Sequence, residues 1–345
     1  MKYYFAPLEG ITGYIYRRAH HSFYPGLDRY YAPFIVPKEK KYLNTKERND
    51  LLPANNEGMT VIPQIMTNQP EEFLRIAQVL ARDYGYQEIN LNLGCPSKTV
   101  VSKKRGSGFL SEPKQLEAFL IQVCKELEKS GMKLSVKTRI GVEKPEEFDT
   151  LLKIYQSVPL SELIIHPRVQ KDFYKNRPDI RAFRMAYESY PAAGWELCYN
   201  GDVSDCADAE RLLTEFSGIS AVMIGRGLLT NPMLVHEIKA KESGGTLNRR
   251  FADDDAEKAE RKRRYHFYRF LQEEYAAVLY GEKNILFKMK ELWSYMSQDF
   301  TEPQKYWKKM KKAQKLADFD AAVFSLCNEQ KLLPDRELVH NIRKG

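Results

Sequence analysis

Short apolar runs rich in β-branched and aromatic residues alternate with longer helical patterns along the first two thirds of the chain. The apolar runs predict eight strands, at 3–8, 29–35, 61–66, 88–93, 134–139, 162–166, 196–200 and 221–224. Helical patterns follow most of them, at 70–84, 112–130, 145–157, 179–189, 204–216 and 228–240. Eight such units within about 240 residues are typical of a (β/α)8 barrel. A doubly wound open sheet is the alternative, but no Gly-x-Gly-x-x-Gly follows the first strand.

The alternation of strands and helices stops near Ser243-Gly244-Gly245-Thr246, which indicates a boundary. Beyond it the pattern predicts four amphipathic helices, at 253–279, 283–297, 303–316 and 318–332. We therefore expect an α/β fold, with a TIM barrel over residues 1–242 followed by a small all-α helical bundle over 243–345.

Composition limits the class of protein. The 345 residues are 43% hydrophobic and 29% charged, which is typical of a soluble globular protein. No run reaches the length of a membrane span, and no signal peptide precedes the first strand, so we expect a cytoplasmic monomer without a membrane partner. The five cysteines are scattered without a Cys-x-x-Cys pair, which favours neither a metal site nor a disulfide framework. The formal net charge of +8 is a modest hint of an anionic partner.

A single thiol stands at the end of the fourth predicted strand. The strand reads Ile89-Asn90-Leu91-Asn92-Leu93, so its aliphatic and amide side chains lie on opposite faces. Gly94 then frees the backbone, and Pro96 biases Cys95 toward an extended conformation. Most free cysteines are inert and buried. This one is followed by a basic, glycine-punctuated loop, Lys103-Lys104-Arg105-Gly106-Ser107-Gly108, and its placement favours chemistry.

Two glycine-containing loops follow the seventh and eighth predicted strands, where barrels of this kind often bind a phosphate. They read Asn200-Gly201-Asp202 and Gly225-Arg226-Gly227. Glycines let backbone N–H groups approach a phosphate, and the Arg226 guanidinium adds charge and forked donors. Simple turns are the alternative, since Asn-Gly is a turn signal anywhere.

The other predicted strand ends carry groups that suit a flat polar ring system. Lys137 and Arg139 share one face of the fifth strand, and His166 and Arg168 end the sixth. The first strand ends in Ala6-Pro7-Leu8, and Gln64 lies in the third. A phosphate site, a ring-edge site, a cation and a thiol together suggest flavin mononucleotide (FMN) with an acid beside it, because side chains cannot themselves supply a hydride.

The span 89–107 resembles the signature of the tRNA-dihydrouridine synthases, in which Asn, any residue and Gly-Cys-Pro precede a spaced Gly-Ser. Further motifs match the family in order over about residues 3–235. The resemblance implies that Cys95 is catalytic and that Asn92 contacts the substrate uridine. It places flavin-binding positions at Ala6, Pro7, Gln64, Lys137, His166, Asn200, Gly201, Asp202, Gly225 and Arg226, and Leu8 stands where the family has methionine. The chain departs from the family's His-Gly-Arg-Thr at 166–169, where proline removes a backbone N–H and valine a hydroxyl.

The resemblance also implies a mechanism in which NADPH reduces FMN, flavin N5 delivers hydride to C6 of uracil, and Cys95 protonates C5. Lys137 would stabilise negative charge on the reduced flavin. Contacts to substrate and tRNA are expected from Arg139, Arg168, Lys103, Lys104, Arg105, Lys308, Lys309 and Lys312, with the basic run 261–264 as a further candidate. Two alternatives are an FMN-dependent dehydrogenase or ene-reductase of a small molecule and a non-catalytic RNA-binding barrel.

Overall fold

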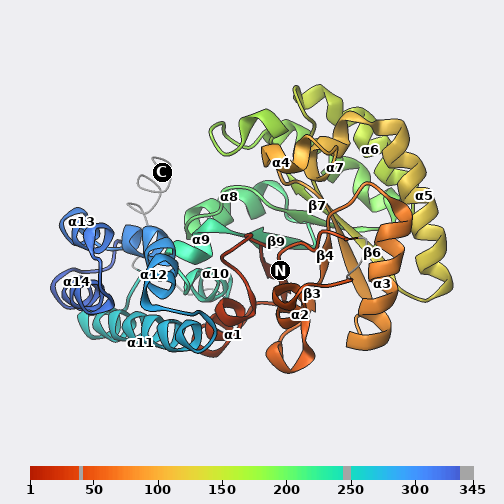
Figure 1. The fold of residues 1–345 in the computed structure, drawn as a ribbon. Coiled ribbons are helices and arrows are strands. Elements are labelled where there is room, and N and C mark those ends of the chain that lie inside the picture. Colours follow the sequence, from red (N-terminus) through yellow and green to blue (C-terminus); the bar gives the residue numbers. More distant parts are fainter. Residues whose placement is uncertain (39–41, 244–249, 335–345) are drawn as a thin grey trace. The chain divides into compact units, whose positions relative to one another are not determined.

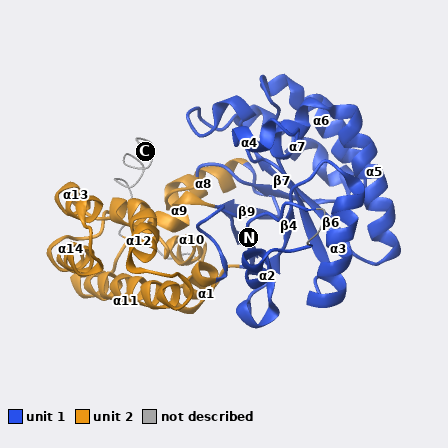
Figure 2. Cartoon of the chain, in the orientation of Figure 1, with its two compact units in different colours: residues 1–14, 28–202, 216–224 blue, residues 15–27, 203–215, 225–345 orange. Residues whose placement is uncertain are grey.

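The computed structural model describes residues 1–38, 42–243 and 250–334. They form two compact units, each made of separate stretches of the chain (Figure 2). Unit 1 holds residues 1–14, 28–202 and 216–224, and unit 2 holds 15–27, 203–215 and the described residues from 225 onward. The predicted division at 242/243 follows chain order, whereas these units are discontinuous. The predicted boundary glycines Gly244 and Gly245 lie outside the described residues.

Unit 1 contains a parallel sheet that nearly closes into a barrel (Figure 1). Its strands are β1 (Lys2–Phe5), β2 (Arg29–Tyr31), β3 (Val61–Ile62), β4 (Gln64–Ile65), β5 (Glu88–Leu93), β6 (Lys133–Arg139), β7 (Glu162–His166), β8 (Glu196–Tyr199) and β9 (Ala221–Ile224). Their order is β3-β2-β1-β9-β8-β7-β6-β5-β4, and each pair of neighbours in this order runs parallel. The predicted (β/α)8 barrel is confirmed.

The predicted third strand, 61–66, is two short strands. β3 pairs with β2, whereas β4 pairs with β5, so this segment joins the two ends of the sheet order. Pro63 stands between them and has no N–H to donate to a ladder. A parallel bridge between Ile35 and Ile65 adds a further contact across the same gap.

Helices lie outside the strands of unit 1 (Figure 1), and their ends follow from the sequence. They are α2 (Thr45–Leu51), α3 (Pro70–Tyr84), α4 (Lys98–Val101), α5 (Pro113–Lys129), α6 (Phe148–Gln156) and α7 (Ile180–Ala193). In α3, Pro70 occupies the first turn, where a missing N–H costs nothing. Gly85 ends the helix with φ of 75°, a left-handed conformation that glycine adopts without strain.

The amino-terminal end of the barrel interior holds a buried carboxylate. Glu162, the first residue of β7, is 1% exposed and accepts a 2.6 Å hydrogen bond from the Tyr31 hydroxyl. The Arg29 guanidinium lies 3.7 Å from Glu162 and 3.2 Å from Glu88. Burial raises the pKa of Glu162 to about 7, because removing water disfavours the charged form.

Unit 2 is helical. It includes α8 (Cys206–Glu215), α9 (Arg226–Thr230), α10 (Leu234–Glu242), α11 (Asp254–Val278), α12 (Glu282–Met296), α13 (Gln304–Lys312) and α14 (Leu316–Glu329), with all but the first residue of α1 (Tyr14–Phe23). The four predicted bundle helices correspond to α11–α14. A buried network links α11 to the segment that follows α12: Asp299 accepts hydrogen bonds of 2.6 and 2.7 Å from Arg250 and also pairs with Arg264 of α11. No helix within the described residues is both long enough and apolar enough to span a membrane.

Candidate active site

The turn after β5 fixes the backbone of Cys95 from two sides. The Asn92 side-chain oxygen accepts hydrogen bonds from the N–H groups of Gly94 and Cys95, at 3.1 and 3.0 Å. The Cys95 carbonyl accepts two more, from the Ser107 hydroxyl and N–H, at 2.9 and 3.1 Å. A Cβ on Gly106 would stand 2.8 Å from that carbonyl, so only glycine fits there. The spaced Gly-Ser of the motif is therefore part of the structure that holds the thiol.

Cys95 differs from the other cysteines in its exposure. All five are free thiols, and Cys95 is half-buried whereas the other four are buried. Burial raises the pKa of the Cys95 thiol, with smaller opposing effects of a hydrogen bond from the Ser97 backbone and of the nearby cations Arg139 and Lys137. At neutral pH the thiol is therefore protonated, and it can act as an acid.

A ladder of amides crosses three neighbouring strands beside the thiol. Gln64 donates to the Asn90 side chain at 2.7 Å and accepts from Asn92 at 2.7 Å, while Asn90 donates to the Ser135 hydroxyl at 3.0 Å. The strand register explains the ladder, because Gln64 pairs with Asn90 and Asn90 pairs with Ser135. The second side-chain N–H of Gln64 has no acceptor among the described residues.

Lys137 lies next to Asn92 in the register of β5 and β6. Its side chain is half-buried, and its ammonium group has no hydrogen-bond partner or counterion in the described part of the chain. Burial, with a smaller contribution from Arg139, lowers the pKa of Lys137 to about 8. A desolvated cation without a partner is suited to a ligand that carries negative charge or carbonyl oxygens.

Arg139, predicted to contact the substrate, is committed to the protein. Its guanidinium is 1% exposed and donates to the carbonyls of Gly94, Val169 and Phe173, each at 2.9 Å. It therefore ties the turn that carries Cys95 to the loop after β7. These three bonds favour a structural role for Arg139, and its direct contact with the substrate stays a prediction.

Arg168 is also predicted to meet the substrate, and it too is buried, at 2% exposure. It forms a bidentate ion pair with Asp202, at 3.1 and 2.5 Å, and donates to His166 Nε2 at 3.0 Å. Because a guanidinium can only donate, Nε2 accepts and the imidazole proton is on Nδ1. Asp202 and Arg168 thus set the tautomer of His166.

The loop after β8 places Gly201, which has no side chain, at the carboxyl ends of the strands. A Cβ on Gly201 would overlap the Tyr199 hydroxyl, so any other residue would require the Tyr199 ring to move. The Gly201 N–H has no acceptor among the described residues. Asn200 donates from its amide to the Met223 carbonyl at 2.8 Å, which fixes the start of this loop.

The end of β1 offers no spare backbone donor. The Ala6 N–H donates to Ile224 at 2.9 Å, Pro7 has none, and the Leu8 N–H donates to Thr12 Oγ1 at 2.8 Å. This segment can therefore only accept hydrogen bonds from a ligand. In unit 2, Gly225 directly follows β9 in the chain and precedes α9, and Arg226 is half-buried.

The predicted RNA-facing cations differ in their surroundings. Lys103 is exposed, Lys104 pairs with Glu112, and Arg105 pairs with Glu72. In unit 2, Arg264 is buried, and Arg261 donates to Glu257 and to the Cys327 carbonyl, so the run 261–264 is partly structural. The lysines of α13 predicted to contact tRNA are exposed and have no ion pair within the described residues: Lys308, Lys309 and Lys312.

Three residues that sequence reasoning missed contribute to this end of unit 1. Tyr174 is half-exposed, with its ring 6.0 Å from His166 and 5.7 Å from the Arg139 guanidinium carbon. An aromatic pair, Phe173-Tyr174, in a polar loop after a strand was the available signal. Glu72 and Ser135 gave no signal, because only the fold brings them to their partners.

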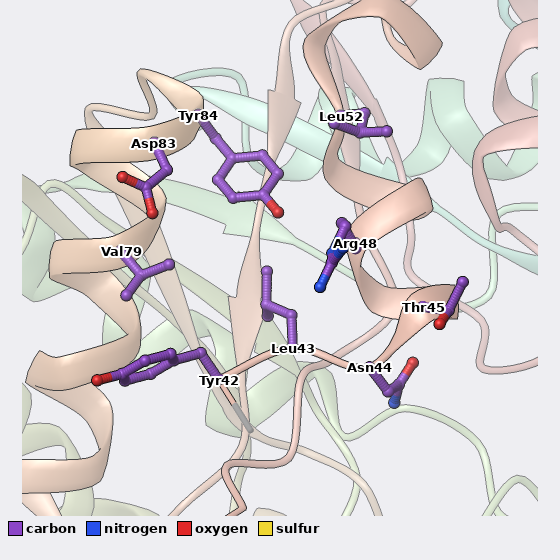
Figure 3. A pocket seen from close by; sticks show the side chains of 9 residues that line it. All are labelled: Tyr42, Leu43, Asn44, Thr45, Arg48, Leu52, Val79, Asp83 and Tyr84. Carbon is purple, nitrogen blue, oxygen red and sulfur yellow. The ribbon is translucent and has the colours of Figure 1, made fainter. Parts of the chain in front are cut away.

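A cavity of about 670 Å³ lies between α2 and α3 (Figure 3). Its lining includes Arg48, from α2, and Tyr84, from α3, and none of the predicted site residues. The candidate site therefore lies at the strand ends, and this cavity is not part of it. Within the described residues, no group of three His, Cys, Asp or Glu side chains is placed to hold a metal ion.

These features define an enzyme of the (β/α)8-barrel class, with a protonated thiol and an unpaired ammonium group at neighbouring strand ends. The chain matches the family model described as dihydrouridine synthase (Dus) over residues 4–328, and it belongs to that family of oxidoreductases. Both the predicted family and the predicted enzyme class are confirmed.

Known proteins similar to this chain agree with that assignment. A Staphylococcus epidermidis (strain ATCC 12228 / FDA PCI 1200) protein named "Probable tRNA-dihydrouridine synthase" is 28% identical over 248 residues, which are 70% of this chain and 73% of the relative. A Bacillus subtilis (strain 168) protein named "Probable tRNA-dihydrouridine synthase 2" is 26% identical over 249 residues, again 70% and 73%. The solved structure of morphinone reductase shares the fold, with a TM-score of 0.50 and 11% identity over 70% of this chain and 86% of that one.

Proposed function

We propose that the protein reduces uridine in tRNA to 5,6-dihydrouridine, with FMN as cofactor and NADPH as reductant. The observation that carries the proposal is the half-buried, protonated thiol of Cys95 beside the unpaired ammonium of Lys137, in a chain of the dihydrouridine synthase family.

The residues at the strand ends of unit 1 fit a flavin. Donors without acceptors come from Lys137, Gly201 and Gln64, while Ala6 and Pro7 offer acceptors only. A planar ring with both carbonyl and N–H edges, carrying a phosphate, has the matching groups. His166, Asn200 and the loop at Gly225-Arg226 are further flavin-binding positions in this proposal. Bound FMN supplies the hydride that reduces C6 of uracil.

The thiol of Cys95 provides the proton for C5 of uracil. Its raised pKa keeps the proton on sulfur until transfer, after which solvent restores it. Asn92 and Ser107 hold the backbone on either side, so the direction of the thiol is set before substrate arrives. Asn92 is predicted to contact the uridine, and its existing bonds to Gln64, Gly94 and Cys95 favour a positioning role.

Lys137 contributes charge. Its ammonium group, with a pKa of about 8, stays largely protonated at neutral pH and stabilises negative charge that develops on the ring system in front of it. The Arg168–Asp202 pair keeps His166 in one tautomer, with the imidazole proton on Nδ1.

The proposal is tested by incubating the purified protein with FMN, NADPH and a tRNA transcript that lacks modifications. We expect bound flavin and the appearance of dihydrouridine at defined positions of the transcript. A protein that binds flavin and oxidises NADPH with small enones but leaves tRNA unchanged would be a small-molecule reductase. A protein that binds tRNA but cannot be loaded with FMN would be a non-catalytic RNA-binding barrel.

Reversing the charge of Lys308, Lys309 and Lys312 should weaken tRNA binding without loss of flavin. These lysines are exposed on α13 and have no ion pair within the described residues, so they are available to phosphates. Each lysine–phosphate interaction that the substitutions remove from duplex tRNA should also reduce the log–log slope of affinity against salt by about 0.9.

The matched control changes three exposed lysines of α5, Lys114, Lys125 and Lys129, to glutamate, with the same change in net charge. Titration of labelled tRNA at several salt concentrations measures both sets. If the α13 variant and the α5 variant bind alike, the lysines of α13 are solvated surface and the RNA contact lies elsewhere.

A further inference from the structure

The loop that carries Cys95 is tied to the turn between β4 and α3. Glu72, in the first turn of α3, accepts a hydrogen bond from the Arg105 guanidinium at 3.2 Å and another from the Thr67 hydroxyl. The Asn68 side chain donates to the Lys103 carbonyl at 3.2 Å. The carboxylate of Glu72 is thus held by Thr67 on its own turn, and it holds Arg105 across to the other loop.

Arg105 directly precedes, in the chain, the residues that hold the backbone of Cys95. Its carbonyl accepts from the Gly108 N–H at 3.0 Å, which closes a turn around Gly106 and Ser107. Ser107 in turn donates twice to the Cys95 carbonyl. Glu72 is therefore linked to Cys95 by the side chain of Arg105, the backbone from Arg105 to Ser107, and the hydrogen bonds of Ser107.

The backbone in front of Arg105 is strained. Lys104 has φ of 51°, a left-handed conformation that residues with a side chain rarely adopt. Such a conformation persists only where surrounding contacts fix it. Here the Lys104 N–H donates to the Val101 carbonyl at 2.8 Å and the Arg105 N–H donates to the Val100 carbonyl at 3.2 Å, as at the end of many helices. The side chains of Lys104 and Arg105 also pair with Glu112 and Glu72, so Glu72 adds a contact to a turn that the backbone already closes.

We propose that Glu72 is a positioning residue for Cys95, acting through Arg105 and Ser107. It touches neither the thiol nor the substrate. This inference rests on the proposed role of Cys95 as proton donor, and it reassigns Arg105 from tRNA binding to the support of the catalytic loop. Without the carboxylate, the Lys103–Gly108 turn relaxes and the thiol loses its fixed direction.

The test compares Glu72→Gln with Glu71→Gln in the FMN-loaded protein. Glu71 is the preceding residue on α3, and it is exposed and accepts only from the Gln122 side chain among the described residues. In Glu72→Gln we expect kcat for uridine reduction to fall roughly 10-fold, because a small displacement of a reacting group is costly. KM for tRNA and the rate of flavin reduction by NADPH should stay unchanged, and Glu71→Gln should match the wild type.

Alkylation of the thiol by iodoacetamide gives a readout that does not depend on turnover. The other four cysteines are buried, so Cys95→Ala identifies the signal of Cys95. Release of the loop exposes the thiol and raises its thiolate fraction, so alkylation of Glu72→Gln should be roughly 3-fold faster or more. This outcome is expected even for a protein that does not reduce uridine, so failure of the proposed function is distinguishable.

Arg105→Gln separates support of the loop from RNA binding. If Glu72 acts through Arg105, this variant lowers kcat as Glu72→Gln does, and the double variant is no worse than either single one. A rise in KM for tRNA with unchanged kcat would assign Arg105 to RNA and overturn the proposal. Wild-type alkylation and kcat in a folded, flavin-loaded Glu72→Gln would also overturn it.

Discussion

Replacement of Cys95 by alanine is expected to slow uridine reduction by roughly 10²-fold or more, as for the loss of a positioned acid. Flavin reduction by NADPH should stay near the wild-type rate, because the thiol takes no part in it. The thiol is the half-buried member of five free cysteines, and its raised pKa keeps it protonated at neutral pH. Stopped-flow measurement of the two half-reactions checks both expectations.

Cys124→Ala is a suitable control, since Cys124 is a buried thiol on α5, away from the strand ends. It should leave both half-reactions unchanged. Serine at 95 should fall between cysteine and alanine, because a hydroxyl is a weaker acid than a thiol. A Cys95→Ala variant that reduces tRNA at the wild-type rate would show that another group, or water, protonates C5.

Replacement of Glu162 by glutamine is expected to raise the free energy of unfolding at pH 8 by up to about 3 kcal/mol, with little effect near pH 4. Burial raises the pKa of Glu162 in the folded protein to about 7, from an ordinary value of 4.5. Between these two values the folded state binds more protons than the unfolded state. The stability of the wild type therefore falls as pH rises from about 4.5 to about 7.

Glutamine removes this titration and keeps an oxygen for the Tyr31 hydroxyl, which donates to Glu162 at 2.6 Å. Glu196→Gln is the control, because Glu196 is the first residue of β8 and pairs with Lys2 with 42% of its side chain exposed. Urea unfolding from pH 4 to pH 9 measures all three proteins. Parallel curves for wild type and Glu162→Gln would mean that Glu162 is charged in the fold without penalty.

Chain order and local periodicity were sufficient for the barrel. Seven of the eight predicted strands match single observed strands. A buried strand needs either alternating apolar and polar residues or a continuous apolar run, and both patterns are visible in the sequence. The third strand was predicted as one and is two, since a proline without a donor forces the change of partner between β3 and β4. The predicted helix at 303–316 ends earlier, at Lys312.

Some residues of the candidate site could be placed from the sequence alone, because the residue type and its position at a predicted strand end were sufficient to select them. Cys95, Lys137 and Gly201 stand at the predicted strand ends, because parallel strands carry their carboxyl ends to the same edge of the barrel. The partners of basic side chains could not be predicted from the sequence. A basic residue gives the same sequence signal whether its side chain faces water or a backbone carbonyl. The predicted contacts of Arg139, Arg168 and Arg105 with the substrate or tRNA rest on that signal alone.

The barrel, the family motif and the thiol at the end of the fourth predicted strand follow from the linear sequence alone, because each depends on neighbours within a few positions. The role of each polar group depends instead on the folded chain. The bonds of Arg139 to Val169 and Phe173, and of Glu72 to Arg105, join residues 30 or more positions apart. No periodicity encodes such pairings, since they arise when separate loops are brought to one end of the strands.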